Sequence, residues 1–191
     1  QRQMCIRDRD NSISAEANNI YIIHYFDERK SKIAILDDGH GMLEEELINA
    51  MRLNSKNPEA ERGDQDLGRF GLGLKSASLS QSEILTVRTK RDGCDSTAMW
   101  DLSESGNIKR DNEYGLILNP DRKDGQFILD LLDKVETGTI VLWENLNDEM
   151  FVSANSEKTA LNFKTIIAQA RKYLEMTFHR FIGLGGGLNI H

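Results

Sequence analysis

The stretch GRFGLGLKSAS, residues 68–78, places three glycines close together just before a lysine and a serine. Such a stretch is typical either of a plain loop-to-helix junction or of a turn whose bare backbone approaches a phosphate. In the second case the N–H groups of Gly71 and Gly73 would point at the anion from the start of a helix, and Lys75 would neutralise phosphate charge. The spacing matches neither a GxxxxGK[ST] loop nor a GxGxxG turn that directly follows a strand.

The segment ILDDGHGM, residues 35–42, ends an apolar run with a carboxylate and then turns through two glycines. The carboxylate of Asp37 could accept a hydrogen bond from an exocyclic amine such as that of adenine, and Gly39 and Gly41 would let the backbone approach a flat ring. The alternative is an ordinary strand-to-helix turn with a capping aspartate.

Two further residues carry weaker signals. Asn11, in DNSISAEA (residues 10–17), offers a neutral amide oxygen, which is a hard ligand suited to Mg²⁺. Thr139 opens the segment GTIVLWENL (residues 138–146), and its hydroxyl could bond a cluster of carboxylate and water. Taken singly, Asn11 is better explained as a solvent-facing side chain, and Thr139 carries no functional signal.

The elements that must position these residues follow from residue type and periodicity. We expect a hairpin of two strands at 18–26 and 32–39, and two strands around the Arg91-Asp92-Gly93 turn. Apolar residues at helical spacing predict a helix at 43–53, and the polar run at 54–66 predicts a long loop. The other predicted elements are a helix at 72–79, weak pieces at 103–133, a strand at 138–146, a long helix at 157–182 and the start of a strand at 188–191. The mixture, without regular alternation of strand and helix, favours an α+β two-layer sandwich.

Composition narrows the function classes. The net charge of −7 argues against a protein that binds nucleic acid over most of its surface. No apolar run reaches the roughly 18–20 residues that a membrane-spanning helix needs. Cys5 and Cys94 match no metal-ligand spacing, so we expect free thiols in a reducing, cytoplasmic compartment. The four histidines are scattered, and a metal held by histidine is not expected.

Taken in order, the four blocks resemble the nucleotide-binding boxes of the GHKL ATPase superfamily, whose members include gyrase, the ninety-kilodalton heat-shock chaperone, sensor histidine kinases, mismatch-repair ATPases and microrchidia proteins. DNSISA resembles the N-box, DDGHGM the G1 box, GRFGLGLKSAS the G2 box and GTIVLWENL the last G box. The resemblance is greatest to the microrchidia-like and chaperone-like branch. It implies the Bergerat fold, an α+β sandwich with a mixed, mainly antiparallel sheet covered by helices on one face.

The resemblance also implies roles for individual residues. Asn11 would coordinate the Mg²⁺ of Mg-ATP, Asp37 would bind the adenine amine, and Thr139 would support Asp37 through water. Residues 68–75 would wrap the phosphates, and residues 54–66 would close over them as a lid. The residues assigned to the nucleotide are Asn11, Ser14, Ala15, Asp37, Gly39, Gly41, Met42, Gly68, Arg69, Phe70, Gly71, Leu72, Gly73, Leu74, Lys75 and Thr139.

One position departs from the family pattern. Members that hydrolyse ATP place a glutamate four residues before the N-box asparagine as general base, and here that position is Arg7. Arginine cannot accept a proton near neutral pH, so we expect Mg-ATP binding with poor hydrolysis, and no catalytic residue is assigned. Residues 1–9 resemble an artefactual or truncated segment, and residues 10–191 are expected to form one ATP-binding domain with a truncated C-terminus.

Three functions fit these observations. In the first, ATP closes the lid and drives conformational change or homodimerisation of a larger protein that acts on DNA or on a protein client. The second is the catalytic domain of a histidine kinase, and the third is a binding module that has lost the nucleotide. The roughly 65 residues between the glycine stretch and Thr139 argue against the compact kinase domain. A costly strand-end carboxylate at Asp37 argues against the third. No membrane partner is expected.

Overall fold

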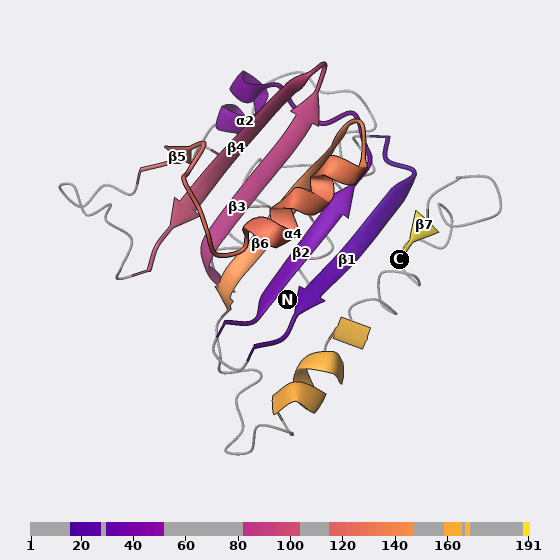
Figure 1. Ribbon diagram of the computed structural model, residues 1–191, viewed down its shortest axis with the longest axis vertical. Helices are drawn as coiled ribbons and strands as arrows, with labels where there is room; N and C mark the ends of the chain where they lie inside the picture. Colours follow the sequence, from indigo (N-terminus) through magenta and orange to yellow (C-terminus); the bar gives the residue numbers. More distant parts are fainter. Residues whose placement is uncertain are drawn as a thin grey trace, which may run out of the picture.

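The computed structural model describes residues 16–27, 30–51, 82–103, 115–146, 159–165, 167–168 and 189–191, and its elements are drawn in Figure 1. The strands are β1 (Asn19–Tyr25), β2 (Lys32–Asp37), β3 (Ser82–Arg91), β4 (Cys94–Asp101), β5 (Ile117–Leu118), β6 (Gly138–Leu146) and β7 (Asn189–Ile190). The helices are α2 (Glu44–Met51), α4 (Gln126–Leu129) and the 3-10 helix η1 (Asp130–Lys134). Residues 159–165 and 167–168 are also helical.

The strands form one sheet in the order β5-β4-β3-β6-β2-β1-β7. All neighbours are antiparallel except β1 and β7, which are parallel, so the predicted α+β class with a mixed, mainly antiparallel sheet is confirmed. The late strand β6 lies between β2 and β3 (Figure 1). This insertion brings segments that are far apart in the sequence into one row at the centre of the sheet.

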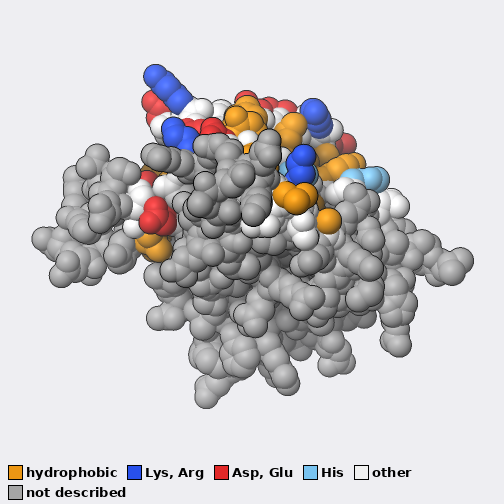
Figure 2. All heavy atoms as spheres, turned by 90° about the horizontal axis from the view of Figure 1, so that it is seen from below, with side chains coloured by type: hydrophobic (Ala, Val, Ile, Leu, Met, Phe, Trp, Pro, Cys, Tyr) orange, Lys and Arg blue, Asp and Glu red, His pale blue; other side chains and the backbone are white. Residues whose placement is uncertain are grey.

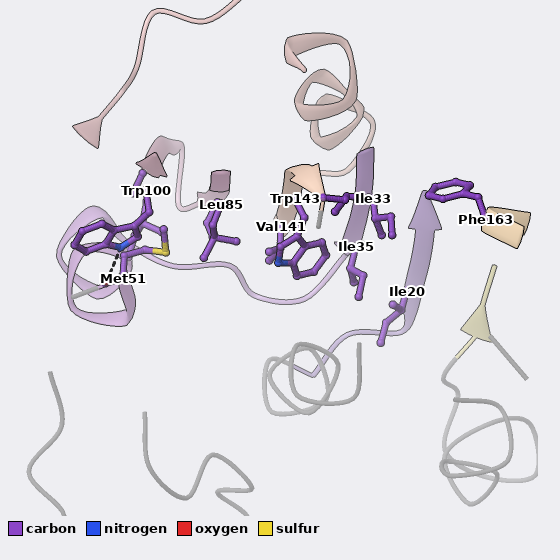
Figure 3. Packing of buried hydrophobic residues seen from close by; sticks show 13 residues of the cluster. Ile20, Ile33, Ile35, Met51, Leu85, Trp100, Val141, Trp143 and Phe163 are labelled. Atoms are coloured by element: carbon purple, nitrogen blue, oxygen red, sulfur yellow. Dashed lines mark hydrogen bonds between the residues drawn. The ribbon is translucent and has the colours of Figure 1, made fainter. Parts of the chain in front are cut away.

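The main core lies on the sheet face that carries the odd-numbered residues of β2, β3 and β6. Helix α2 packs on this face through Leu47 and Met51, and the indole N–H of Trp100 donates to the Met51 carbonyl at 2.9 Å (Figure 3). Phe163 adds a fully buried ring from the helical residues 159–165. Burying each such side chain contributes about 1.5–3 kcal/mol to folding. The strand residues of this core are Ile20, Ile33, Ile35, Leu85, Val87, Ala98, Trp100, Val141, Trp143 and Leu146.

The opposite face carries a smaller core beneath α4 and η1. Ile128, Leu129 and Leu132 pack there on Ala34, Leu36, Ile140 and Leu142. Because β2 is covered on both faces, all six of its residues are buried, which explains its nearly continuous apolar sequence. The sheet therefore has helical cover on the second face as well, in a region where the sequence predicted only weak pieces.

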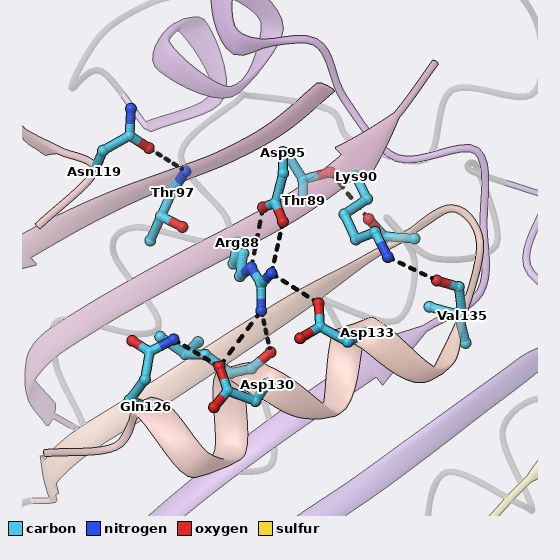
Figure 4. Close-up of polar contacts among 12 residues, drawn as sticks. Arg88, Thr89, Lys90, Asp95, Thr97, Asn119, Gln126, Asp130, Asp133 and Val135 are labelled. Carbon is cyan, nitrogen blue, oxygen red and sulfur yellow. Dashed lines mark hydrogen bonds and ion pairs between the residues drawn. The ribbon is translucent and has the colours of Figure 1, made fainter. Parts of the chain in front are cut away.

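Arg88 fixes η1 to the sheet on this second face (Figure 4). Its guanidinium forms a bidentate pair with Asp95 at 3.0 and 2.6 Å, and it also donates to Asp133 at 2.8 Å and to the Leu129 carbonyl at 3.1 Å. The hydrogen bond to Asp95, with the charges of Asp95 and Asp133, outweighs burial and raises the pKa of Arg88 above its ordinary value. Through Arg88 of β3, this network ties β4, α4 and η1 to one side chain.

A buried charged cluster lies on the same face. Lys32 and Glu144 are only 3% and 2% exposed, and their Nζ and Oε1 atoms are 3.3 Å apart. Arg122 donates to the other Glu144 oxygen and to the Thr86 hydroxyl, and Asp124 pairs with Lys32 at 3.2 Å. The charges compensate each other, which is the condition for burying them.

Surface hydrophobic residues are dispersed over the described part of the chain. The most exposed large ones include Phe127 and Tyr25, whose rings meet edge to face with centroids 5.4 Å apart. Figure 2 shows hydrophobic side chains interspersed with charged ones where described residues form this view. Such scattered exposure is normal for a protein surface.

Most predicted elements are confirmed within a residue or two. The strand at 138–146 has the predicted bounds, and the predicted strands at 18–26 and 32–39 form the hairpin of β1 and β2. The Asp92–Gly93 turn joins β3 to β4, and both of its residues have positive φ. Cys94, just after this turn, is an exposed free thiol, as expected. The predicted loop at 54–66, the predicted helix at 72–79, most of the predicted helix at 157–182 and Cys5 lie outside the described residues.

Candidate functional site

Asp37 is the last residue of the buried central strand β2 and is 6% exposed. Its Oδ1 accepts a hydrogen bond from the Gly39 N–H at 3.1 Å, which starts the turn that leads to α2. The strand thus delivers a carboxylate to the edge of the core, where its oxygens can accept hydrogen bonds.

Asp37 belongs to a row of three polar side chains across the centre of the sheet. Asp37 is paired with Thr139 of β6, and Thr139 is paired with Thr89 of β3. All three lie on the face of the main core, because they continue the odd-numbered positions of their strands. Directly opposite residues have Cβ atoms roughly 5 Å apart, so the row is continuous. Thr139 is 9% exposed and Thr89 is fully buried.

The Thr89 hydroxyl joins the row to the loop that follows β2. It accepts a hydrogen bond from the Met42 N–H at 2.8 Å and donates to the Gly138 carbonyl at 3.1 Å. It also lies 3.1 Å from the Thr139 hydroxyl. One side chain therefore holds the loop at Met42, the start of β6 and the Thr139 hydroxyl in fixed relation.

Gly41 is required where this loop crosses the ends of β3 and β6. Its φ is +67°, and a Cβ at this position would lie 2.1 Å from the Lys90 carbonyl oxygen and 3.1 Å from that of Gly138. No side chain larger than hydrogen fits such an approach. The sequence suggests that Gly41 lets the backbone approach a flat ring, and the fold supplies a further reason for glycine at this position.

The start of α2 is fixed to the end of β3 beside the loop. Glu46 accepts hydrogen bonds from the Leu43 N–H and from the Arg91 guanidinium, both at 2.9 Å. The first contact is the N3 half of a capping box, and the three glutamates of this first turn also favour the helix dipole. The loop is thus held at both ends.

Asp38, the neighbour of Asp37, has a structural role that the sequence did not reveal. Its carboxylate accepts hydrogen bonds from the backbone N–H groups of Asn18 and Asn19, at 2.8 and 2.7 Å, and from the Asn19 side chain at 2.6 Å. Burial alone would raise the pKa of Asp38, but these hydrogen bonds outweigh it and lower the pKa below its ordinary value. Asp38 therefore anchors the start of β1, while Asp37 faces the polar row.

The sequence-predicted site residues divide into two sets. The structure brings together Asp37, Gly39, Gly41, Met42 and Thr139, all of them at one end of β2, β3 and β6. Thr89 was not predicted, because a threonine in a strand has no functional signal until the register places it beside Thr139. The residues that lie outside the described part are Arg7, Asn11, Ser14, Ala15 and residues 68–75. Within the described residues, no group of three His, Cys, Asp or Glu could hold a metal ion.

Comparison with known families decides what kind of domain carries this row. A family model described as histidine kinase-, DNA gyrase B- and HSP90-like ATPase matches residues 9–139, more than half of the chain. The chain belongs to this family. The matched range ends at Thr139 and includes all three members of the polar row, Asp37, Thr89 and Thr139.

Curated relatives of this GHKL ATPase domain point to the branch that the motifs indicated. The chaperone protein HtpG of Clostridium botulinum (strain Hall) is 31% identical over 99 residues, which are 48% of this chain and 16% of the relative. ATPase morc-1 of Caenorhabditis elegans is 30% identical over 84 residues, 44% of this chain and 10% of the relative. The chain spans less than a fifth of the length of either. The resemblance to the chaperone-like and microrchidia-like branch is thus confirmed.

One physical finding concerns membranes. Among the described residues, no helix has the length and apolar character that crossing a bilayer requires.

Proposed function

We propose that this GHKL domain binds Mg-ATP, with the adenine seated against the row of Asp37, Thr139 and Thr89. The observation that carries the proposal is the row itself: a buried strand-end carboxylate beside two buried hydroxyls on the core side of the sheet. The oxygens of a carboxylate accept hydrogen bonds, and the exocyclic amine of adenine is a donor that suits them.

The residues present fit the nucleotide and its ion. In this proposal Gly41 and Met42 would form the floor and wall of the base pocket, Gly39 would let the backbone approach the ring, and Ser14 and Ala15 would lie near the ribose and adenine. Backbone N–H groups of residues 68–75 and the Lys75 ammonium suit a triphosphate. The Asn11 amide oxygen suits Mg²⁺, which would neutralise phosphate charge when bound.

ATP is proposed to act as a conformational signal. Residues 54–66 close as a lid over the bound nucleotide, and closure drives conformational change or homodimerisation of a larger cytoplasmic protein that acts on DNA or on a protein client. The motif order and the chaperone-like and microrchidia-like relatives support this proposal.

Nucleotide binding is tested by thermal unfolding of the 191-residue chain with and without Mg-ATP. At a hundred times its Kd, a ligand stabilises the folded state by about 2.7 kcal/mol. For a chain of this size that corresponds to a rise in Tm of about 5–10 °C. Asp37→Asn should abolish the rise in Tm, because the neutral amide has one acceptor oxygen and an NH₂ donor in place of two charged acceptor oxygens.

Asp101→Asn is the matched control. Asp101 also ends a strand and accepts a backbone hydrogen bond two residues on, from Ser103 at 3.0 Å, but it lies on β4 away from the row. It should keep the ATP-induced rise. An unchanged Tm of the wild-type chain in saturating Mg-ATP would refute the proposed function.

Hydrolysis is proposed to be slow because Arg7 fills the position of the general base. Arg7→Glu should raise the rate of phosphate release, by about 10²–10⁴-fold if the carboxylate acts as a base on water. Arg7→Gln removes the positive charge without adding a base and serves as its control. Equal rates for the two variants would contradict the assignment of this position.

A further inference from the structure

We propose that Thr89 is a positioning residue that sets the direction of the Thr139 hydroxyl and thereby the purine preference of the site. The inference rests on the proposed function, because it concerns the base that Asp37 and Thr139 would contact. It follows from counting the hydrogens and lone pairs of two adjacent hydroxyl groups.

The Thr89 hydroxyl has one hydrogen to donate and two lone pairs to accept with. The Met42 N–H can only donate, so it occupies one lone pair at 2.8 Å. The Gly138 carbonyl can only accept, so it takes the hydrogen at 3.1 Å. What remains on Thr89 is a single lone pair, and the Thr139 hydroxyl lies 3.1 Å away. The Thr139 hydrogen is therefore directed to Thr89.

The consequence for Thr139 is that only its lone pairs face the ligand side. Beside it, the Asp37 carboxylate also offers only acceptors. The base site then presents a row of acceptors, which favours a ligand edge that carries an amine, reached directly or through a water molecule. Adenine has an exocyclic amine at this edge. Hypoxanthine has a carbonyl oxygen in its place, and that oxygen would face acceptors with no donor.

Burial of Thr89 and Thr139 stabilises this orientation of the Thr139 hydroxyl group. Thr89 is fully buried, so water cannot replace its contacts if they are lost, and Thr139 is 9% exposed. Replacing Thr89 with valine keeps the volume and branching but removes the acceptor for the Thr139 hydrogen. The Thr139 hydroxyl can then turn toward the ligand and donate, which serves the carbonyl oxygen of hypoxanthine.

The experiment compares the affinities of Mg-ATP and Mg-ITP for the 191-residue chain by calorimetric titration. Wild type should prefer ATP. In Thr89→Val the ratio of the two dissociation constants should shrink by about five- to tenfold, the value of one hydrogen bond. Thr89→Ser keeps the hydroxyl but loses the methyl group, so it should keep the wild-type ratio of dissociation constants. If packing by the methyl group set the ratio, Thr89→Ser would change it.

Thr86→Val is the matched control, since Thr86 lies on the same strand, is equally buried and bonds Arg122 on the opposite face. It should lower stability and leave the ratio unchanged. Thr139→Val, which has no hydroxyl to direct, should also shrink the ratio, and it keeps the test decisive if Thr89→Val does not fold.

The outcomes separate the two levels of the argument. A Thr89→Val chain that binds both nucleotides more weakly by the same factor, or a Thr139→Val chain with the wild-type ratio, overturns the role of Thr89 and leaves ATP binding intact. A wild-type chain that binds neither nucleotide overturns the proposed function and this inference with it.

Discussion

Replacing Gly41 with alanine should damage the loop after β2 far more than the same change in an ordinary turn. Gly41 has φ +67°, and its added Cβ would lie 2.1 Å from the Lys90 carbonyl oxygen. Gly93, in the turn between β3 and β4, has a similar φ of +78° but nothing within 4 Å of an added Cβ. Comparing the alanine variants of Gly41 and Gly93 separates the free-energy cost of a left-handed backbone from the cost of a steric collision.

The magnitudes follow from these two geometries. A left-handed backbone costs a non-glycine residue about 1–2 kcal/mol, and this should be the whole effect of Gly93→Ala. The backbone oxygen of Lys90 cannot move without disturbing β3, so Gly41→Ala adds a collision worth about 1–3 kcal/mol more. For a chain of this length the added cost lowers Tm by a further 3–10 °C or so.

Urea unfolding followed by tryptophan fluorescence measures this difference. Both tryptophans of the chain, Trp100 and Trp143, are buried in the main core, so their emission reports unfolding of the sheet. Gly41→Ala should also lose the Mg-ATP stabilisation, because moving the loop breaks the bond between Met42 and Thr89. Equal free energies of unfolding for the two variants would show that the loop does not need its close approach to β3.

Two further predictions concern charges outside the polar row. Because the pKa of Asp38 is lowered in the folded protein, its carboxylate stabilises the fold above the unfolded pKa, and this stability is lost as pH falls through the folded pKa. Asp38→Asn should therefore flatten the fall of Tm between about pH 5 and pH 2. A variant whose Tm depends on acid pH as the wild type does would count against the anchoring role of Asp38. Glu144→Gln leaves the buried Lys32 and Arg122 charges without their shared carboxylate and should cost about 3–5 kcal/mol in urea unfolding, whereas the exposed Glu83→Gln should cost little.

The strands of the sheet are the part that the sequence predicts best. The predicted bounds of β6 are those of the structure, because a glycine precedes an apolar run rich in β-branched residues that packs on both faces of the sheet. The hairpin of β1 and β2 follows for the same reason. The position of Asp37 at the end of a buried strand also follows from a carboxylate directly after an apolar run, while its contact with a base stays a prediction.

Features that depend on contacts between residues far apart in the sequence could not be predicted. Helix α4 has four residues and η1 has five, too few for helical periodicity to show, and their position depends on Arg88. The cluster of Lys32 and Glu144 requires β6 to lie beside β2, which the chain order does not indicate. Thr89 looks like any strand threonine until the pairing of β3 with β6 places it opposite Thr139.

The strand order also determines when the row of Asp37, Thr139 and Thr89 can form. Met42 and Thr89 are 47 residues apart, and Thr89 and Thr139 are 50 residues apart, yet they share one hydrogen-bonded group. A slip of one residue in either pairing of β6 would turn Thr139 to the opposite face. The row therefore forms only when all three central strands have paired, so a ligand bound there stabilises the whole sheet rather than a single loop. Substitutions that loosen the pairing of β3 with β6 should weaken nucleotide binding even where they touch no part of the ligand.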